Sequence, residues 1–384
     1  MELNTKRSSL KRLKVNISSY TMIFALVSIW LILTIATKGI FISPRNLSML
    51  VRQTSIVAVL SLGMSFVIIS GNTDLSVGST LGLCGGVAAV LQVWLDSSAI
   101  VAVLATIGVG CVLGAWNGFW IAYRKIPAFI VTLGGFMGFQ GILLGLTKSM
   151  TIAPMKPGFV VIGQGYLPRV VGYAVAVLGA AFAVISIIRS RRSKIKYGLD
   201  APSLISTIIK CIGFAALIFV FVIVMDNYSG IPVPVMIVLV LSLLLSIVAT
   251  RTRYGRSIYA IGSNKEAAQL AGINDKRVIF VMYIVMGALA ATAGIIYTAR
   301  MNAGTASAGN MMQMDAIAAC VIGGVSMSGG IGNLPGALVG ALVIASLDNG
   351  MSLLNTEYFW QYIVKGGILI IAVWVDTINK SKSK

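Results

Sequence analysis

The sequence contains no histidine among its 384 residues, and it has only 11 acidic residues against 30 basic ones. Without an imidazole, the chain has no His-containing catalytic triad, no His-ligated metal site and no imidazole proton relay. The four cysteines each lie inside an apolar run and form no C-x-x-C pair, so we interpret them as small packing residues. These absences leave little chemistry for an enzyme, and we expect no catalytic or metal-ligating residues.

Charged side chains are scarce overall. They make up 11% of the chain, hydrophobic residues make up 57%, and the mean hydropathy is +0.93. A soluble domain carries roughly 25% charged residues, so this chain does not have enough charge to cover a folded surface in water. Lipid must be its main solvent. The composition therefore predicts an all-α integral membrane protein with about 10–12 transmembrane helices, some of them short or broken.

Apolar stretches that approach the about 20 residues needed to cross the hydrocarbon core recur along the whole sequence. They lie near residues 20–37, 51–70, 78–95, 99–122, 127–147, 170–188, 206–225, 233–250, 278–298, 315–326, 335–350 and 359–376. The tenth and eleventh stretches are short and are joined by a glycine-rich segment. We expect shortened or broken helices at both.

Most of the 30 basic residues fall in alternate connectors and in the two terminal tails. If all the apolar stretches cross, these connectors share one side, which the positive-inside rule makes the cytoplasm. The net charge of +19 is then a signal of orientation, and we expect no nucleic-acid partner. The predicted organisation is a cytoplasmic tail (1–19), one polytopic transmembrane domain (20–377) and a second cytoplasmic tail (378–384).

Three acidic residues adjoin glycine-rich apolar segments: Asp74, Asp315 and Asp348. A charge inside a membrane usually pairs or lines a water-filled path. Asp74 and Asp315 also stand at the starts of expected helices and are suited to capping them, so both interpretations stay open. The two regions lie in different halves of the chain and resemble the discontinuous helices of transport cores built from repeats. The candidates for a translocation path or gate are Asn72, Asp74, Ser76, Asp315, Asp348 and Asn349.

Glycines recur at four-residue spacing within several apolar stretches, which lets helix backbones approach closely in a membrane. Both static packing and movement between two arrangements suit such stripes. The stripes are Gly78, Gly82 and Gly86; Gly110, Gly114 and Gly118; Gly134 and Gly138; Gly141 and Gly145; Gly336 and Gly340.

One polar connector, residues 251–277, is long. Ser263 or Asn264 is placed to cap a short helix, Glu266 to lie in its first turn and Gly272 to end it. The apolar face of such a helix is too small for firm lipid anchoring. A protein partner is therefore favoured over an interfacial anchor.

The same connector carries a family resemblance. Glu266-Ala267-Ala268 followed by Gly272 resembles the coupling motif of ABC-importer permeases, which docks on the ATPase subunit. The segments 72–79, 259–262, 315–324 and 347–350 resemble the monosaccharide permeases of that superfamily, which group with the branched-chain amino-acid type. Strings at 114–118, 122–125 and 360–366 are most similar to the xylose-type permeases. Like them, and unlike ribose-type permeases, the chain has an extra helical hairpin at about 166–225.

This resemblance implies the transmembrane subunit of an importer in the bacterial cytoplasmic (inner) membrane that moves a monosaccharide, D-xylose for the xylose type, into the cytoplasm. The implied partners are a second permease subunit, ABC ATPase subunits, an extracytoplasmic sugar-binding protein and membrane lipid. The implied ATPase-coupling residues are Glu266, Ala267, Ala268 and Gly272. No G-x-x-x-x-G-K-[ST] loop is present, so we expect this chain to bind no cofactor and the partner subunit to use ATP.

The alternative is an ion-coupled secondary sugar transporter. Intramembrane acids and discontinuous helices suit such a carrier. The missing histidine, the few acidic residues and a helix displayed for docking disfavour it.

Overall fold

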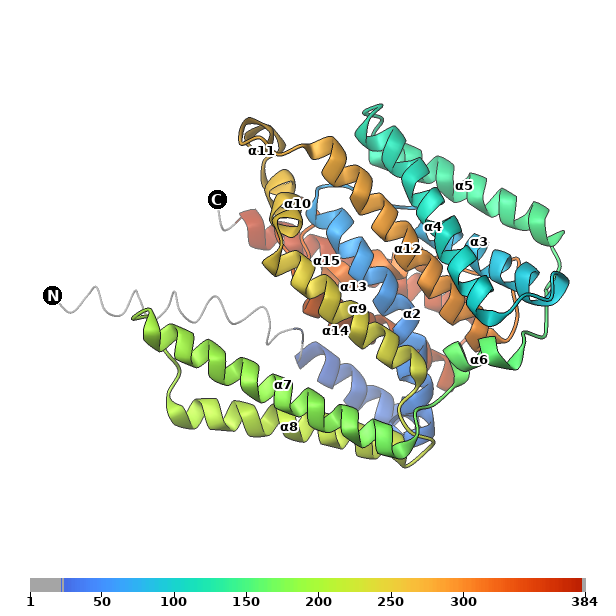
Figure 1. Cartoon of the computed structure of the whole chain (residues 1–384). Coiled ribbons are helices and arrows are strands. Elements are labelled where there is room, and N and C mark those ends of the chain that lie inside the picture. The colour runs from blue at the N-terminus through green and yellow to red at the C-terminus, as the bar shows by residue number, and fades with distance from the viewer. Residues whose placement is uncertain (1–21, 23, 382–384) are drawn as a thin grey trace.

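The computed structural model describes residue 22 and residues 24–381, most of them in helices (Figure 1). Among these residues there is no β-strand, and two isolated antiparallel bridges join Ile152 to Gly304 and Tyr166 to Pro232. Nine of the described helices are long and apolar enough to cross a membrane. The prediction of an all-α integral membrane protein is confirmed. The predicted N-terminal tail and residues 382–384 lie outside the described residues.

The helices follow one another with mostly short connections. An apolar helix spans Phe24–Ala36, and a short 3-10 helix η1 spans Ile40–Ile42. The remaining elements are α2 (Pro44–Ile69), α3 (Val77–Ala89) continued by η2 (Val90–Trp94), α4 (Ala99–Ala122), α5 (Ala128–Thr147), α6 (Pro157–Gln164), α7 (Arg169–Lys196), α8 (Leu204–Asp226), α9 (Val233–Arg251), α10 (Arg253–Ser263), α11 (Lys265–Leu270), α12 (Asp275–Met301), α13 (Met312–Ile322), α14 (Leu334–Leu353) and α15 (Tyr358–Ser381).

The predicted spans match these helices with one correction. The tenth, α13, is short as predicted, but the eleventh prediction is wrong because α14 is a full 20-residue helix. Asn333 caps α14, its Oδ1 accepting a hydrogen bond from the Gly336 N–H at 2.6 Å. At the other end, α14 continues past Asp348 and Asn349, whose side chains bind residues on neighbouring helices.

Several connectors are more helical than predicted. The helix α2 begins at Pro44 because the Ser43 hydroxyl caps it, accepting a hydrogen bond from the Asn46 N–H at 3.4 Å. The helix α7 extends eight residues past the predicted span 170–188, to Lys196. The long connector 251–277 contains α10 before the predicted short helix. Residues 378–381 of the predicted C-terminal tail continue α15.

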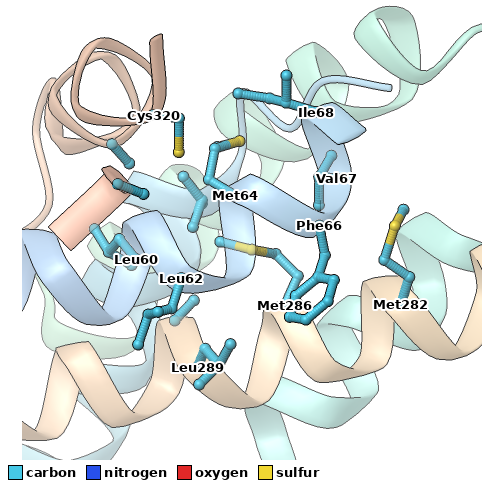
Figure 2. Close-up of a cluster of buried hydrophobic side chains, with 14 of the residues drawn as sticks. Leu60, Leu62, Met64, Phe66, Val67, Ile68, Met282, Met286, Leu289 and Cys320 are labelled. Carbon is cyan, nitrogen blue, oxygen red and sulfur yellow. The ribbon is translucent and has the colours of Figure 1, made fainter. Parts of the chain in front are cut away.

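The helices α2 and α12 form the centre of the bundle. In their most apolar segments, 83% of α2 and 67% of α12 are buried, with 72% of the neighbouring α3–η2 segment, against 11% of α8 and α9. Figure 2 shows Leu62 and Phe66 of α2 beside Met286 and Leu289 of α12. Cys320 of α13 packs on α2 from another side, its Sγ 3.3 Å from the Ser61 carbonyl oxygen. The packing role predicted for the cysteines is confirmed for this one.

The predicted glycine stripes divide into two kinds. A side chain at Gly114 of α4 would overlap the carbonyl of Tyr283 on α12, and one at Gly340 of α14 would overlap that of Ala319 on α13. These glycines let neighbouring backbones touch. The stripe on α5 instead faces away from the rest of the chain, and a Cβ added there would meet no atom within 4 Å. Its members are Gly134, Gly138, Gly141 and Gly145.

The Asp74 and Asp315 regions, one in each half of the chain, each adjoin a non-helical connection between two helices. Residues 70–76 separate α2 from α3, and residues 302–311 separate α12 from the short α13. Residues 302–311 lie against the start of α3, because a side chain at Gly309 would overlap the carbonyl of Gly78. Gly309 has a φ of +79°, which glycine adopts without strain. A descent of the two halves from one repeat stays a prediction.

The hairpin of α7 and α8 lies on one side of the bundle (Figure 1). Its outer surface is apolar, and the two helices pack mainly on each other. Two antiparallel backbone hydrogen bonds close its base: Leu167 N–H to Ile231 O and Val233 N–H to Gly165 O, both 2.9 Å. The turns α4–α5 and α7–α8 and the helix α11 lie at one end of the bundle, and α6 lies at the other.

Candidate functional site

The short helix α11 has the local structure predicted for the coupling loop. Asn264 caps it, its Oδ1 accepting a hydrogen bond from the Ala267 N–H at 2.9 Å. Glu266 lies in the first turn, where the helix dipole favours a carboxylate. Gly272 follows the helix with a φ of +81°, and the next N–H, that of Ile273, bonds back to the Ala268 carbonyl at 3.0 Å. The capping predictions for Asn264 and Gly272 are confirmed.

The exposed face of α11 is unusual for a surface turn. Leu270 is 91% exposed, whereas Ala268 points inward and is buried. Glu266, Ala267 and Gly272 are exposed with Leu270. The structure therefore brings three of the four predicted coupling residues to one surface, together with a leucine that has no apolar neighbour to cover it.

A pocket lies between α11, the α4–α5 turn and residues 70–76; we term it the α11 pocket. Its apolar part comes from Ile121, Ile126, Ile279 and their neighbours. Lys265 pairs with Asp275 across one side, Nζ to Oδ2, at 3.3 Å. The polar residues that line the pocket are Asn72, Lys125, Lys265, Gln269, Asp275 and Lys276. One predicted path residue, Asn72, thus lies beside the predicted coupling helix.

Asp74 lies two residues before Ser76, the N-cap of α3, and binds that residue. Its Oδ1 accepts hydrogen bonds from the Ser76 N–H at 2.8 Å and the Ser76 hydroxyl at 2.7 Å. The Ser76 hydroxyl also accepts one from the Asn117 amide at 2.8 Å. Asp74 is only 4% exposed, so these bonds satisfy a carboxylate that water does not reach. The N-cap of α3 is Ser76 and its first turn holds no acidic residue, so Asp74 is neither the N-cap nor a first-turn acid; a gating role stays a prediction.

Lys365 of α15 joins the other two acids. Its Nζ lies 2.9 Å from Asp315 Oδ1 on α13 and 2.8 Å from Asp348 Oδ2 on α14. The three side chains are mostly buried, with 22% of the Lys365 side chain, 9% of that of Asp315 and 13% of that of Asp348 exposed. We term these residues the ion triad. Any movement of α15 away from α13 and α14 must separate these charges.

Asn349 turns to a different neighbour. Its side-chain amide exchanges two hydrogen bonds with that of Asn46 on α2, at 2.8 and 3.0 Å. The predicted set therefore separates into a segment at Asn72–Ser76, the ion triad and this amide pair, with no direct bond between Asp74 and the triad among the described residues. Lys365 and Asn46 were missed from the sequence. The available signal for Lys365 was its position as a basic residue inside an apolar stretch.

A family model described as the branched-chain amino acid transport system / permease component matches residues 46–373. This chain belongs to that permease family. The match covers the permease from α2 into α15 and includes every candidate residue described above. The chain is accordingly a transport permease, not an enzyme, and its apolar helices make it a multi-pass membrane protein.

Individual relatives of the permease are similar over nearly their whole length. The xylose transport system permease protein of Haemophilus influenzae is 46% identical over 372 residues, 96% of this chain and 98% of that protein. The xylose transport system permease protein of Escherichia coli K12 is 46% identical over 98% of this chain and 95% of that protein. The ribose import permease protein of E. coli K12 is 32% identical over 93% and 92%. No solved structure matches the permease.

Proposed function

We propose that this chain is the transmembrane subunit of an ABC importer that moves D-xylose into the cytoplasm. The observation that carries the proposal is the 46% identity to two xylose transport system permeases over nearly the full length of each chain. The ribose import permease is only 32% identical. An ion-coupled carrier has no support from these relatives, which are named as components of transport systems or import permeases.

The ATPase subunit docks on α11 in this proposal. Glu266, Ala267 and Gly272 are exposed there, and Ala268 packs beneath them and holds the helix to the bundle. Leu270, 91% exposed, supports a protein partner because covering an exposed leucine contributes roughly 1.5–3 kcal/mol to association. The partner subunit binds and hydrolyses ATP, and this chain binds no cofactor. The end of the bundle that carries α11 then faces the cytoplasm, with both termini on that side of the bacterial cytoplasmic membrane.

A second copy of the chain completes the path. The stripe Gly134, Gly138, Gly141 and Gly145 on α5 is open in the single subunit, whereas the stripes on α3, α4 and α14 are filled. Small residues at this spacing bring two helices into close contact in a membrane. Lipid covers the apolar outer surface of α7 and α8. A sugar-binding protein delivers the sugar at the opposite end, near α6.

Within the subunit, the path or gate in this proposal consists of the segment Asn72–Ser76, the ion triad and Asn349. Their role in the proposal is to hold the helix breaks and α15 in one of two arrangements. The carboxylates of Asp74, Asp315 and Asp348 all have partners in this arrangement. A change to the other arrangement requires these hydrogen bonds and ion pairs to break and the carboxylates to find new partners.

The proposal is tested by uptake of labelled D-xylose into proteoliposomes that contain the permease, its ATPase subunit and the sugar-binding protein. Uptake should continue when a protonophore collapses the proton gradient and should stop when ATP is omitted. Uptake that follows the gradient and ignores ATP would refute the ABC assignment. In the same assay, Gly272→Val should abolish uptake, because valine resists the +81° φ that ends α11. Gly138→Val separately tests the proposed contact between α5 and the second copy of the chain, because it puts a side chain into the open glycine stripe.

A further inference from the structure

We propose that the α11 pocket is a second docking point for the ATPase subunit and that it receives an acidic side chain of that subunit beside α11. The inference rests on the proposed function, since it deepens the contact with the same partner. The exposed Leu270 and the α11 pocket then form one continuous interface. Leu270 protrudes into the partner, and the neighbouring pocket, which is lined by lysines, receives a side chain from it.

The charges around the pocket favour an anionic occupant. Lys265 is already paired with Asp275. Lys125 and Lys276 are exposed, and neither forms a salt bridge with any described residue. Two positive charges therefore remain in excess at a concave surface, where they attract negatively charged groups of a partner.

The walls of the pocket favour a carboxylate on an apolar stem. Ile121, Ile126 and Ile279 line it together with the lysines, so an occupant must bury apolar atoms as well as meet ammonium groups. A glutamate side chain has both parts. A free phosphate ion has only the charge, and it would leave these isoleucines without a contact.

The position of the pocket gives such an occupant a mechanical consequence. Lys265 and Gln269 belong to α11, so a side chain in the pocket touches the docking helix itself. Asn72 lies two residues before Asp74, and Ala128 is the first residue of α5. One partner side chain thus contacts the docking helix, the break before α3 and the helix with the open glycine stripe. In this proposal, a movement of the docked ATPase subunit therefore displaces all three elements through that side chain.

The test measures the Kd of the purified ATPase subunit for the full-length permease in nanodiscs, at about 0.1 M and about 1 M salt, where the Debye lengths are about 10 and 3 Å. Three variants are compared with the wild type. Lys125→Glu/Lys276→Glu alters the pocket, and Leu270→Asp alters the α11 surface. Lys194→Glu/Lys196→Glu is the matched control, since it makes the same charge change in exposed residues of α7 at the same end of the bundle.

The pocket variant should raise the Kd about tenfold or more at low salt, with most of the difference lost at high salt. The control should change the Kd less than about twofold. A pocket variant that binds like the wild type or like the control, while Leu270→Asp loses binding, would overturn the pocket inference and leave ATPase docking intact. If Leu270→Asp and the pocket variant both bind normally, ATPase docking on α11, the part of the proposed function on which the inference rests, fails.

A second measurement guards against a misfolded variant and a competing ligand. Lys125 of the wild-type permease should be protected from amine-reactive labelling when the ATPase subunit is bound, whereas Lys194 should not be. Equal labelling of Lys125 with and without the subunit contradicts the proposal. Millimolar inorganic phosphate should leave the wild-type Kd unchanged. A rise in Kd with phosphate that the pocket variant lacks would instead indicate a small-anion site.

Discussion

Replacing Lys365 with methionine isolates the contribution of the ion triad. Methionine keeps most of the side-chain volume but removes the ammonium group that lies 2.9 Å from Asp315 and 2.8 Å from Asp348. The two carboxylates, 9% and 13% exposed, then face each other without a counter-charge. Breaking a buried ion pair by removing one partner costs about 3–5 kcal/mol. We expect about 3 kcal/mol, the lower end of that range, because 22% of the Lys365 side chain is exposed.

The assay is reversible unfolding of the purified permease in mixed micelles, followed by circular dichroism as the fraction of denaturing detergent rises. The decisive comparison is the triple variant Lys365→Met/Asp315→Asn/Asp348→Asn, which has no charge left to bury. Its free energy of unfolding should return to within about 1–2 kcal/mol of the wild type, because neutral replacements of buried ion pairs are often tolerated.

Two results would refute this reasoning. A loss below about 1 kcal/mol in Lys365→Met would mean that water or another group already neutralises the carboxylates. A triple variant no more stable than Lys365→Met would mean that lysine contributes by packing and not by charge.

Other substitutions test separate features. Asn46→Ala should lower the free energy of unfolding by about 1–3 kcal/mol in the same assay, because it leaves the buried Asn349 amide without its partner; a value near zero would contradict the reciprocal pair. Gly114→Leu should abolish the monodisperse peak in size-exclusion chromatography, since leucine cannot fit where α4 touches the backbone of α12. Lys156 donates a hydrogen bond to the exposed Asp96 and holds the pKa of that carboxyl below its usual value. This pairing adds stability only above the pKa of an unfolded aspartate and loses it as the pH falls, and full exposure makes it weak. Asp96→Asn should leave the melting temperature unchanged at neutral pH, and a clear drop would show that the pair is more than a surface contact.

The parts of the fold that were predictable depend on local signals. Apolar runs located the membrane-crossing helices, and the caps of α11 act within four residues of Asn264 and Gly272. The helix α10 was missed because residues 253–263 have no long apolar run. Its buried face consists only of Gly255, Ile258 and Ile261, and their three-residue spacing was the available signal.

The site was harder to predict because its partners are remote in the sequence. Asp315 and Asp348 were recognised as unusual acids, yet nothing local states that Lys365, on a third helix, lies between them. The same holds for Asn349 and Asn46, which are 303 residues apart. Side-chain types indicate that a charge needs a partner, whereas helix packing decides which partner it meets.

The closed base of the α7–α8 hairpin makes that element separable from the rest of the subunit. Residues 165–167 run antiparallel to residues 231–233, so the chain leaves and re-enters the bundle at one point. Cutting there and joining the two sides leaves the order and direction of all later helices unchanged. A different hairpin, or a soluble reporter domain, joined at the same two segments would keep that order and direction. Evolution can therefore vary the rim of this subunit by whole-module replacement while its transport core stays constant.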